Sequence, residues 1–344
     1  MRLGRSLVAV IGLAGLFAGA GPAHAQKQSA CGADAIGLAR TARVDTKGGP
    51  HFGNLQYRGD HLLKEGEVVL TFDDGPHKAY TPAILQTLDA HCTKATFFMV
   101  GRPAIYYPGL VREVAHRGHT VATHTWSHKN LGKSSAAEGE AEIELGISAV
   151  QKALGQPAAP FFRFPYLAYT KATHAHLSSR NTGVFSIDVD SYDFRTRSPT
   201  VMMRNVLKQL EKKRRGIILF HDIQPSTAKG LDALLVELKR RGFRVVHLQA
   251  MQPQTTIASY DSRVGNPKQL ARLASLPVPV SKRGIVSPAW EVSVLRGSEN
   301  PYTGSAFSPK APTAADAPSA AAAGGPKLRR TITDDWRRSV FQGW

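Results

Sequence analysis

Apolar and polar positions alternate regularly between residues 66 and 250. Seven short apolar runs are rich in β-branched and aromatic residues and are bounded by polar residues or glycine, which is typical of buried strands. These runs occupy residues 68–72, 95–100, 120–122, 161–164, 184–187, 217–220 and 245–246. Stretches with helical periodicity lie between them, most clearly at residues 108–117, 136–154, 201–214 and 231–241. The alternation predicts an α/β fold whose parallel strands close, or nearly close, into a distorted (β/α)7 barrel.

The regular pattern ends shortly after Leu248 and predicts a disordered C-terminal extension. Residues 251–303 form an irregular extension without strong periodicity. Residues 304–326 are mostly Ala, Pro, Gly and Ser, so they bury too little apolar surface to offset the entropy lost on ordering. We therefore expect a low-complexity linker there.

Residues 327–344 form a basic and aromatic tail. Its large apolar residues recur at spacings that place them on one face of a helix: Ile332, Trp336, Val340, Phe341 and Trp344. So short a helix is marginal alone in water, so it should order only against a partner surface. That surface could be the barrel, a membrane interface or another envelope protein, and a frayed tail with incidental aromatic residues is the alternative.

The first 25 residues have the pattern of a signal peptide. Two arginines precede an apolar stretch over residues 6–19, and Ala23-His24-Ala25 provides small residues around a cleavage point. The stretch is too short for a comfortable membrane span, although an uncleaved anchor is the alternative. We expect cleavage near Ala25 and export, either to a periplasm or out of the cell. Residues 26–65 would then form an N-terminal arm ahead of the domain at 66–250.

Export changes the interpretation of the two cysteines, Cys31 and Cys92. In an oxidising compartment such a pair is a candidate disulfide, which would tether the N-terminal arm to the domain. Two buried free thiols are the alternative. Neither cysteine has the spacing of a zinc–thiolate site.

The formal net charge of +18 indicates either an acidic partner or simple solubility. Because the chain is expected outside the cytoplasm, nucleic acid is excluded as the partner. Anionic cell-wall polymers or lipid head groups fit better, contacted through the basic tail. Nothing in the sequence determines the oligomeric state.

Charged residues follow the carboxyl ends of five of the apolar runs. Asp73 and Asp74 end the first run, and two adjacent buried carboxylates need a compensating cation. His124 and His128 follow the third run, and a spacing of four predicts that both lie on one face of a helical turn, where they could ligate a divalent metal. Each feature alone also fits an exposed acidic turn or surface histidines.

Three further motifs complete the set. They are Arg163-Phe164-Pro165-Tyr166, then Asp190-Ser191-Tyr192-Asp193-Phe194, then Leu219-Phe220-His221-Asp222. Barrel enzymes place their active sites at the carboxyl ends of the strands, so five such coincidences favour one catalytic site.

In order and spacing, these five motifs resemble those of the polysaccharide deacetylases with a NodB-homology domain, carbohydrate esterase family four. The resemblance covers about residues 66–250. It implies that Asp74, His124 and His128 bind a metal, that Asp73 is the general base and that His221 is the general acid. It further implies that Arg163 orients the base and Asp193 tunes the acid histidine. Substrate-binding residues implied by the resemblance are Tyr166 through its backbone N–H, Phe194 and Leu219.

Two departures from the family pattern affect the expected substrate groove. The family usually has Trp where this chain has Phe194, which keeps an apolar wall but lacks the indole N–H. The family also often has Gly shortly after the Arg-x-Pro motif, where this chain has Leu167-Ala168-Tyr169.

The expected activity is therefore metal-dependent hydrolysis of N-acetyl groups on amino sugars in a polysaccharide, such as peptidoglycan or chitin-like oligomers, with release of acetate. Aspartate and histidine ligands without cysteine suit Zn²⁺ but also Co²⁺, Ni²⁺ or Mn²⁺. The alternatives are an esterase for O-acetyl groups of glycans such as xylan, an amidohydrolase for a small molecule, and an inactive cell-wall binding module.

Overall fold

The computed structural model describes residues 31–57 and 62–265. The predicted signal peptide, linker and tail lie outside the described residues, as do parts of the predicted N-terminal arm and irregular extension. The described strands are β1 (Arg40–Val44), β2 (His51–Phe52), β3 (Glu67–Asp73), β4 (Thr96–Met99), β5 (Thr120–Thr123), β6 (Phe161–Phe162), β7 (Gly183–Phe185), β8 (Val189–Asp190), β9 (Gly216–His221) and β10 (Arg244–Ala250).

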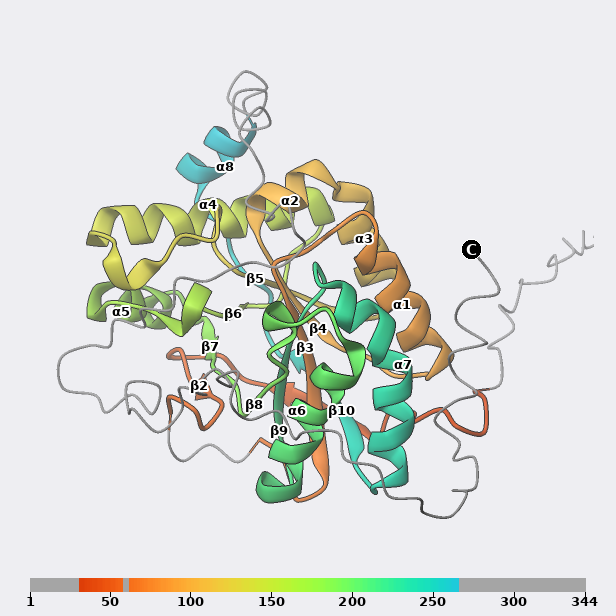
Figure 1. Cartoon of the computed structure of the whole chain (residues 1–344). Helices are drawn as coiled ribbons and strands as arrows, with labels where there is room; N and C mark the ends of the chain where they lie inside the picture. Colours follow the sequence, from red (N-terminus) through yellow and green to blue (C-terminus); the bar gives the residue numbers. More distant parts are fainter. Residues whose placement is uncertain (1–30, 58–61, 266–344) are drawn as a thin grey trace, which may run out of the picture. The chain divides into compact units, whose positions relative to one another are not determined.

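Helices connect most of these strands and lie around their outside (Figure 1). They are α1 (Tyr80–Ala90), α2 (Gly101–Tyr106), α3 (Pro108–His116), α4 (Ala136–Leu154), α5 (Lys171–Ser179), α6 (Pro199–Lys213), α7 (Pro225–Arg240) and α8 (Ala258–Gly265). Three short 3₁₀ turns are η1 (Leu131–Lys133), η2 (Pro165–Leu167) and η3 (Asp193–Arg195). Among the described residues, no helix is both long and apolar enough to cross a membrane.

The described strands pair in parallel, so the predicted α/β class is confirmed. From β3 the sheet runs through β4, β5, β6 and β7 to β2 in one direction, and through β9 to β8 in the other. No ladder between the described strands joins β8 to β7, so the ring of strand pairing is open there. The predicted fifth strand, residues 184–187, ends early at Phe185 in β7, and a separate strand, β8, follows at Val189–Asp190. Between them, the Asp188 side chain accepts hydrogen bonds from Ile217 N and Asn54 N.

Alternating side chains of β3 separate two apolar cores. Val68, Leu70 and Phe72 pack outward against the helices, whereas Val69 packs inward with residues of the other strands. Because successive side chains of a strand point to opposite faces, Asp73 shares the inner face with Val69. The sheet therefore carries a carboxylate to the inner rim at its carboxyl edge.

The segment before β3 extends the fold beyond the predicted repeats. β1 lies parallel to β10, with Arg40 opposite Val246, and β2 lies parallel to β7, with Phe52 opposite Phe185. Ala42, Val44 and Phe52 join the inner apolar core. The predicted N-terminal arm is therefore partly built into the sheet.

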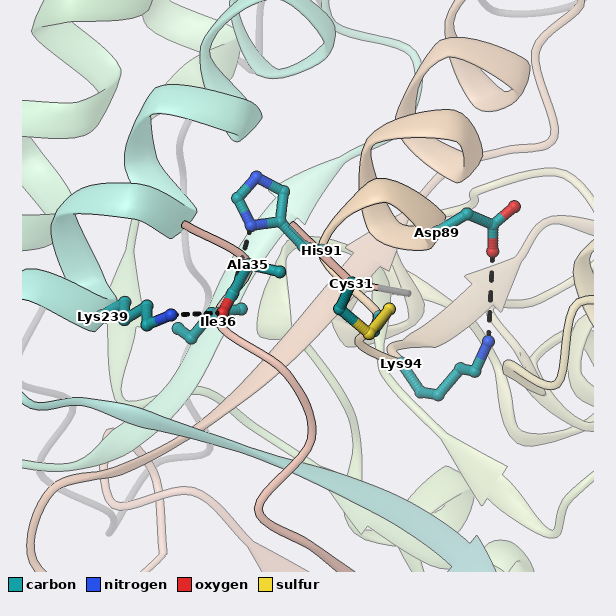
Figure 2. Close-up of a disulfide and its surroundings, with 8 residues drawn as sticks. Cys31, Ala35, Ile36, Asp89, His91, Lys94 and Lys239 are labelled. Carbon is teal, nitrogen blue, oxygen red and sulfur yellow. Dashed lines mark hydrogen bonds and ion pairs between the residues drawn. A yellow bond between two sulfur atoms is a disulfide. The ribbon is translucent and has the colours of Figure 1, made fainter. Parts of the chain in front are cut away.

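Cys31 and Cys92 form a disulfide, which confirms the predicted pairing and anchors the start of the described chain (Figure 2). The arm is also held beside the bond by hydrogen bonds. Lys239 Nζ on α7 donates to Ala35 O at 2.8 Å, and Ile36 N donates to His91 Nδ1 at 3.4 Å. The covalent link therefore belongs to a larger junction between the arm, the end of α1 and α7.

Candidate active site and metal centre

Asp74, His124 and His128 come together at the carboxyl edge of the sheet. A ligand atom from each residue lies within 4.8 Å of the other two. His128 Nε2 lies 3.1 Å and His124 Nε2 lies 3.5 Å from Asp74 Oδ1. Two imidazoles thus converge on one carboxylate oxygen, which is the arrangement expected of ligands around a single cation.

The predicted helical turn between the two histidines is wrong, because residues 124–128 form an irregular loop. Thr125 and His128 have left-handed backbones, with φ of 65° and 61°, which reverse the chain and bring the rings to a centroid distance of 5.0 Å. Glu142 on α4 holds the loop by accepting hydrogen bonds from Ser127 N at 2.9 Å and Ser127 Oγ at 2.8 Å. Left-handed residues at a functional site are maintained by surrounding contacts of this kind.

The chemistry of these three residues fits a divalent metal. His124 Nδ1 lies 2.6 Å from Arg163 O, a carbonyl that can only accept, so Nδ1 carries the proton and Nε2 keeps its lone pair toward Asp74. Asp74 Oδ1 is buried and has no hydrogen-bond partner among the described residues. Burial opposes ionisation of Asp74, but nearby positive charge, His128 first, holds the pKa of this carboxyl well below its usual value. An ionised buried oxygen without a donor is suited to a cation.

Asp73 is held by a buried arginine. Arg163 Nη1 donates to Asp73 Oδ1 at 2.7 Å and to Thr71 Oγ1 at 2.9 Å. The other guanidinium nitrogens donate to the carbonyls of Phe185 and Ser186, both at 3.3 Å. Burial lowers the pKa of Arg163 from its ordinary value, although the charge of Asp73 opposes this shift. Bonds to four groups leave the guanidinium little freedom, so it fixes the direction of the Asp73 carboxylate.

His221 and Asp193 form a second ion pair beside the first. His221 Nδ1 lies 2.7 Å from Asp193 Oδ1, and the His221 backbone N–H donates to Asp193 Oδ2 at 2.7 Å. Burial lowers the pKa of His221, but the charge of Asp193 outweighs burial and raises the pKa to about 10. Asp73 lies opposite His221 in the pairing of β3 with β9, so the two pairs occupy neighbouring strands.

The three substrate-binding residues implied by the resemblance surround these pairs. The Tyr166 ring meets the His128 ring edge-on at 4.8 Å, and the Phe194 ring meets the His221 ring edge-on at 5.6 Å. Leu219 is buried on β9 two residues before His221, so both side chains lie on the same face of the strand. All the residues singled out from the motifs are thus gathered at one edge of the sheet.

The motif analysis assigned no role to Asp222, a buried carboxyl beside these groups. Its Oδ2 accepts a hydrogen bond from Thr81 Oγ1 at 2.6 Å. Burial raises the pKa of Asp222, the hydrogen bond from Thr81 lowers it, and the charge of Asp74 raises it further. The resulting pKa is about 7. A side chain at Gly75 would meet the Asp222 carboxyl at 2.1 Å, so only glycine fits at this place beside Asp74. In the sequence, the indication of Asp222 as a site residue is its position directly after His221, which itself follows an apolar run.

The fold and the site define a class: an α/β protein whose sheet carries, at its carboxyl edge, a histidine–carboxylate cluster that could hold a metal ion, between an Asp–Arg pair and a His–Asp pair. The chain belongs to the polysaccharide deacetylase family. The family model, described as polysaccharide deacetylase, matches residues 62–184. This match contains Asp74, His124, His128 and the Asp73–Arg163 pair, and it ends before Asp193.

Two relatives illustrate the similarity. The peptidoglycan-N-acetylglucosamine deacetylase of Listeria monocytogenes is 34% identical over 187 residues, covering 54% of this chain but 38% of that protein. The chitooligosaccharide deacetylase of a Bradyrhizobium species is 30% identical over 192 residues, covering 52% of this chain and 87% of that protein. The chain therefore spans little more than a third of the Listeria protein and most of the Bradyrhizobium protein.

A solved structure has the same fold. The peptidoglycan deacetylase of Bdellovibrio bacteriovorus superposes with a TM-score of 0.56 at 38% sequence identity, covering 62% of this chain and 59% of that one. The similarity in structure extends over a larger share of this chain than the family model does.

Proposed function

We propose that this protein is a metal-dependent hydrolase that removes N-acetyl groups from amino sugars in a polysaccharide and releases acetate. One observation carries the proposal: the Asp74–His124–His128 cluster lies between a carboxylate held by Arg163 and an imidazole held by Asp193. Amide hydrolysis needs an electrophilic activator, a base for water and an acid for the leaving amine, and this edge offers a candidate for each.

In the proposed reaction Asp73 is the base and His221 the acid. Asp73 accepts the proton of the attacking water, while Arg163 keeps the carboxylate oriented. His221, kept protonated by Asp193, donates a proton to the amine as the C–N bond breaks. The Tyr166 backbone N–H donates to the developing oxyanion, and Phe194 and Leu219 form apolar walls for the acetyl methyl.

Asp74, His124 and His128 would hold the metal, which supplies Lewis acidity when bound. Two imidazoles and one carboxylate suit Zn²⁺ and also accept Co²⁺, Ni²⁺ or Mn²⁺. Soft-ligand metals are disfavoured, since the described cysteines form a disulfide.

The proposed substrate is peptidoglycan or a chitin-like oligomer, supported by the names of the Listeria and Bradyrhizobium relatives. The test is acetate release from peptidoglycan, chitin oligomers and acetylxylan, with Zn²⁺ or Co²⁺ added and with a chelator as control. Release from the N-acetylated substrates, abolished by the chelator, supports the proposal. Release from acetylxylan alone would replace it with an O-acetyl esterase.

We further propose that the protein is exported, with cleavage near Ala25, and that residues 327–344 contact the cell envelope. The Cys31–Cys92 disulfide supports export, because such bonds persist in oxidising compartments. Deleting residues 327–344 should leave activity on soluble oligomers intact and weaken retention on envelope fractions. Unchanged retention would remove the tail from this role.

A further inference from the structure

The segment that precedes the family match reaches the active site. Residues 51–57 lie outside the 62–184 match, and β2 within them pairs with β7. In the turn that follows β2, Gln56 Nε2 donates a hydrogen bond to Leu167 O at 2.7 Å. Leu167 directly follows Tyr166, whose backbone N–H is the proposed oxyanion donor. A residue 111 positions away in sequence thus contacts the turn that carries this donor.

The turn has an unfavourable backbone. Tyr166 and Leu167 have φ of 58° and 53°, so two consecutive residues with side chains are left-handed. Glycine adopts this conformation freely, whereas a residue with a Cβ does so at a cost in free energy. Two left-handed residues in a row persist only where neighbouring groups determine their conformation.

Contacts within the turn hold part of this geometry. Leu167 N donates to Phe164 O at 2.9 Å, and Ala168 N donates to Pro165 O at 3.1 Å. Both bonds close the chain locally, and neither connects it to the rest of the fold. The bond from Gln56 supplies such a connection, because it fixes the Leu167 carbonyl from a separate segment.

The Gln56 segment is itself anchored on both sides. Before it, Asn54 donates from its backbone and side chain to Asp188 Oδ1, at 2.8 and 2.9 Å. After it, the Tyr57 ring stacks on the His51 ring with centroids 4.7 Å apart and lies 6.4 Å from the ring of Tyr169. Because the residues on both sides of Gln56 are anchored, its side chain can fix the position of the Leu167 carbonyl.

We infer that Gln56 is a positioning residue for the reaction: it holds the left-handed Tyr166–Leu167 turn so that the Tyr166 N–H points at the developing oxyanion. The inference rests on the proposed function for its effect on catalysis. It assigns an active-site role to a residue outside the family match. Gln56 acts on Leu167, which adopts a left-handed conformation without the backbone freedom of glycine.

The test uses the full chain and four variants. Gln56→Ala removes the donor, and Gln56→Glu keeps the length but replaces the donor with an acceptor. Leu167→Gly removes the Cβ penalty of the left-handed position, and it is also combined with Gln56→Ala. Gln252→Ala, which truncates an exposed glutamine away from the site, is the matched control.

Gln56→Ala and Gln56→Glu should each lower kcat about tenfold, as expected for a misplaced oxyanion donor, with KM and metal content within twofold of the wild-type values. Adding Leu167→Gly to Gln56→Ala should recover most of this loss, because glycine adopts the left-handed conformation at position 167 without the Cβ penalty. Gln252→Ala should match the wild type. A wild-type kcat in Gln56→Ala, a loss confined to KM, or no recovery in the double variant would overturn the inference.

A second measurement does not depend on activity. Hydrogen–deuterium exchange of the peptide containing residues 164–168 should be faster in Gln56→Ala than in the wild type, and unchanged in Gln252→Ala. Equal exchange in all three proteins would overturn the positioning role even if the wild type releases acetate. If exchange responds but the wild type releases no acetate, the proposed function fails while the structural role of Gln56 stands.

Discussion

At the residue scale, the proposed metal ligands and the proposed proton-transfer residues make different contacts. His124 faces Asp74 through Nε2, whereas Asp73 is bonded to Arg163 through one oxygen. Removing a proposed metal ligand should therefore lower metal content and activity together, whereas removing a proposed proton-transfer residue should lower activity alone.

His124→Ala should lose bound metal and activity together. The Arg163 carbonyl fixes the tautomer of this histidine, and the two remaining ligands leave a cation weakly held. Elemental analysis of purified protein, with acetate release measured in parallel, checks this result. Full metal occupancy in the variant would mean that the cation binds elsewhere.

Asp73→Asn should keep the metal and lower turnover by roughly 100-fold or more, the usual contribution of a positioned base. The amide has nearly the same shape but cannot accept a proton from water. Metal content and kcat are measured on the same preparation, with His124→Ala as the contrasting variant. Near-normal turnover would assign the base to another residue.

Asp193→Asn should move the alkaline limb of the pH–rate profile to lower pH. His221 has its pKa raised to about 10 by Asp193 against the opposing effect of burial, and an acid acts only below its pKa. Without the carboxylate, His221 loses its proton at a lower pH, so activity on the alkaline side falls earlier. A profile that coincides with that of the wild type would contradict the acid role of His221.

The residues of the site could be predicted from sequence, but their geometry could not. Adjacent carboxylates at the end of an apolar run, and histidines shortly after another, can be recognised in the sequence, which therefore predicts Asp74 and His124 as site residues. The sequence does not predict the left-handed backbone at His128. This loop is held by a hydrogen bond from Ser127 N to Glu142, which lies on α4 outside the local motif. Gln56 carries no local signal, since its role arises only when the chain folds back onto Leu167.

At the element scale, prediction succeeded where boundary signals were strong. The helix predicted at 136–154 has the observed bounds of α4, which begins with a Ser135–Glu138 capping box and ends at Gly155 in a left-handed conformation. By contrast, α1 has no side-chain cap, no acidic residue in its first turn and no basic residue in its last turn. β1 and α8 bury few side chains, so their apolar periodicity is weak.

The junction of β1 with β3 depends on an ion pair that should make stability fall in acid. Arg40 donates to both carboxylate oxygens of buried Glu67, at 2.7 and 2.9 Å, and this bonding lowers the Glu67 pKa to about 2. A depressed folded-state pKa contributes stability above the unfolded value of about 4.5, and that contribution is lost as the pH falls through about 2.

Glu67→Gln should therefore lower the free energy of unfolding by about 2 kcal/mol at neutral pH, the scale of a charged hydrogen bond. The difference from the wild type should shrink as the pH falls from about 4.5 toward 2. Urea unfolding of both proteins across this range measures it. A difference independent of pH would show that Glu67 contributes by packing alone.

At the scale of the whole molecule, the disulfide joins the N-terminal arm to Cys92, just after the end of α1, across 61 positions of sequence. Replacing both cysteines with serine should lower the unfolding free energy by about 4 kcal/mol, if the bond acts by restricting the unfolded chain. Metal content and kcat should be unchanged, because the bond lies apart from the carboxyl-edge site. Thermal unfolding with and without reductant checks the loss of stability, and elemental analysis with acetate release checks the second point. An equal unfolding midpoint in all samples would contradict a stabilising role of the disulfide.

The pairing of β1 with β10 has a consequence for how the protein reaches its native state. Arg40 lies opposite Val246 in β10, the last of the described strands, so β1 can pair only after a segment about 200 residues further along the chain has been synthesised. Closing so long a loop is entropically costly, and contacts of this kind slow folding. β1 and the arm should therefore dock late onto a preassembled sheet, and in pulse-labelled refolding their amides should gain protection after those of β3, β4 and β9.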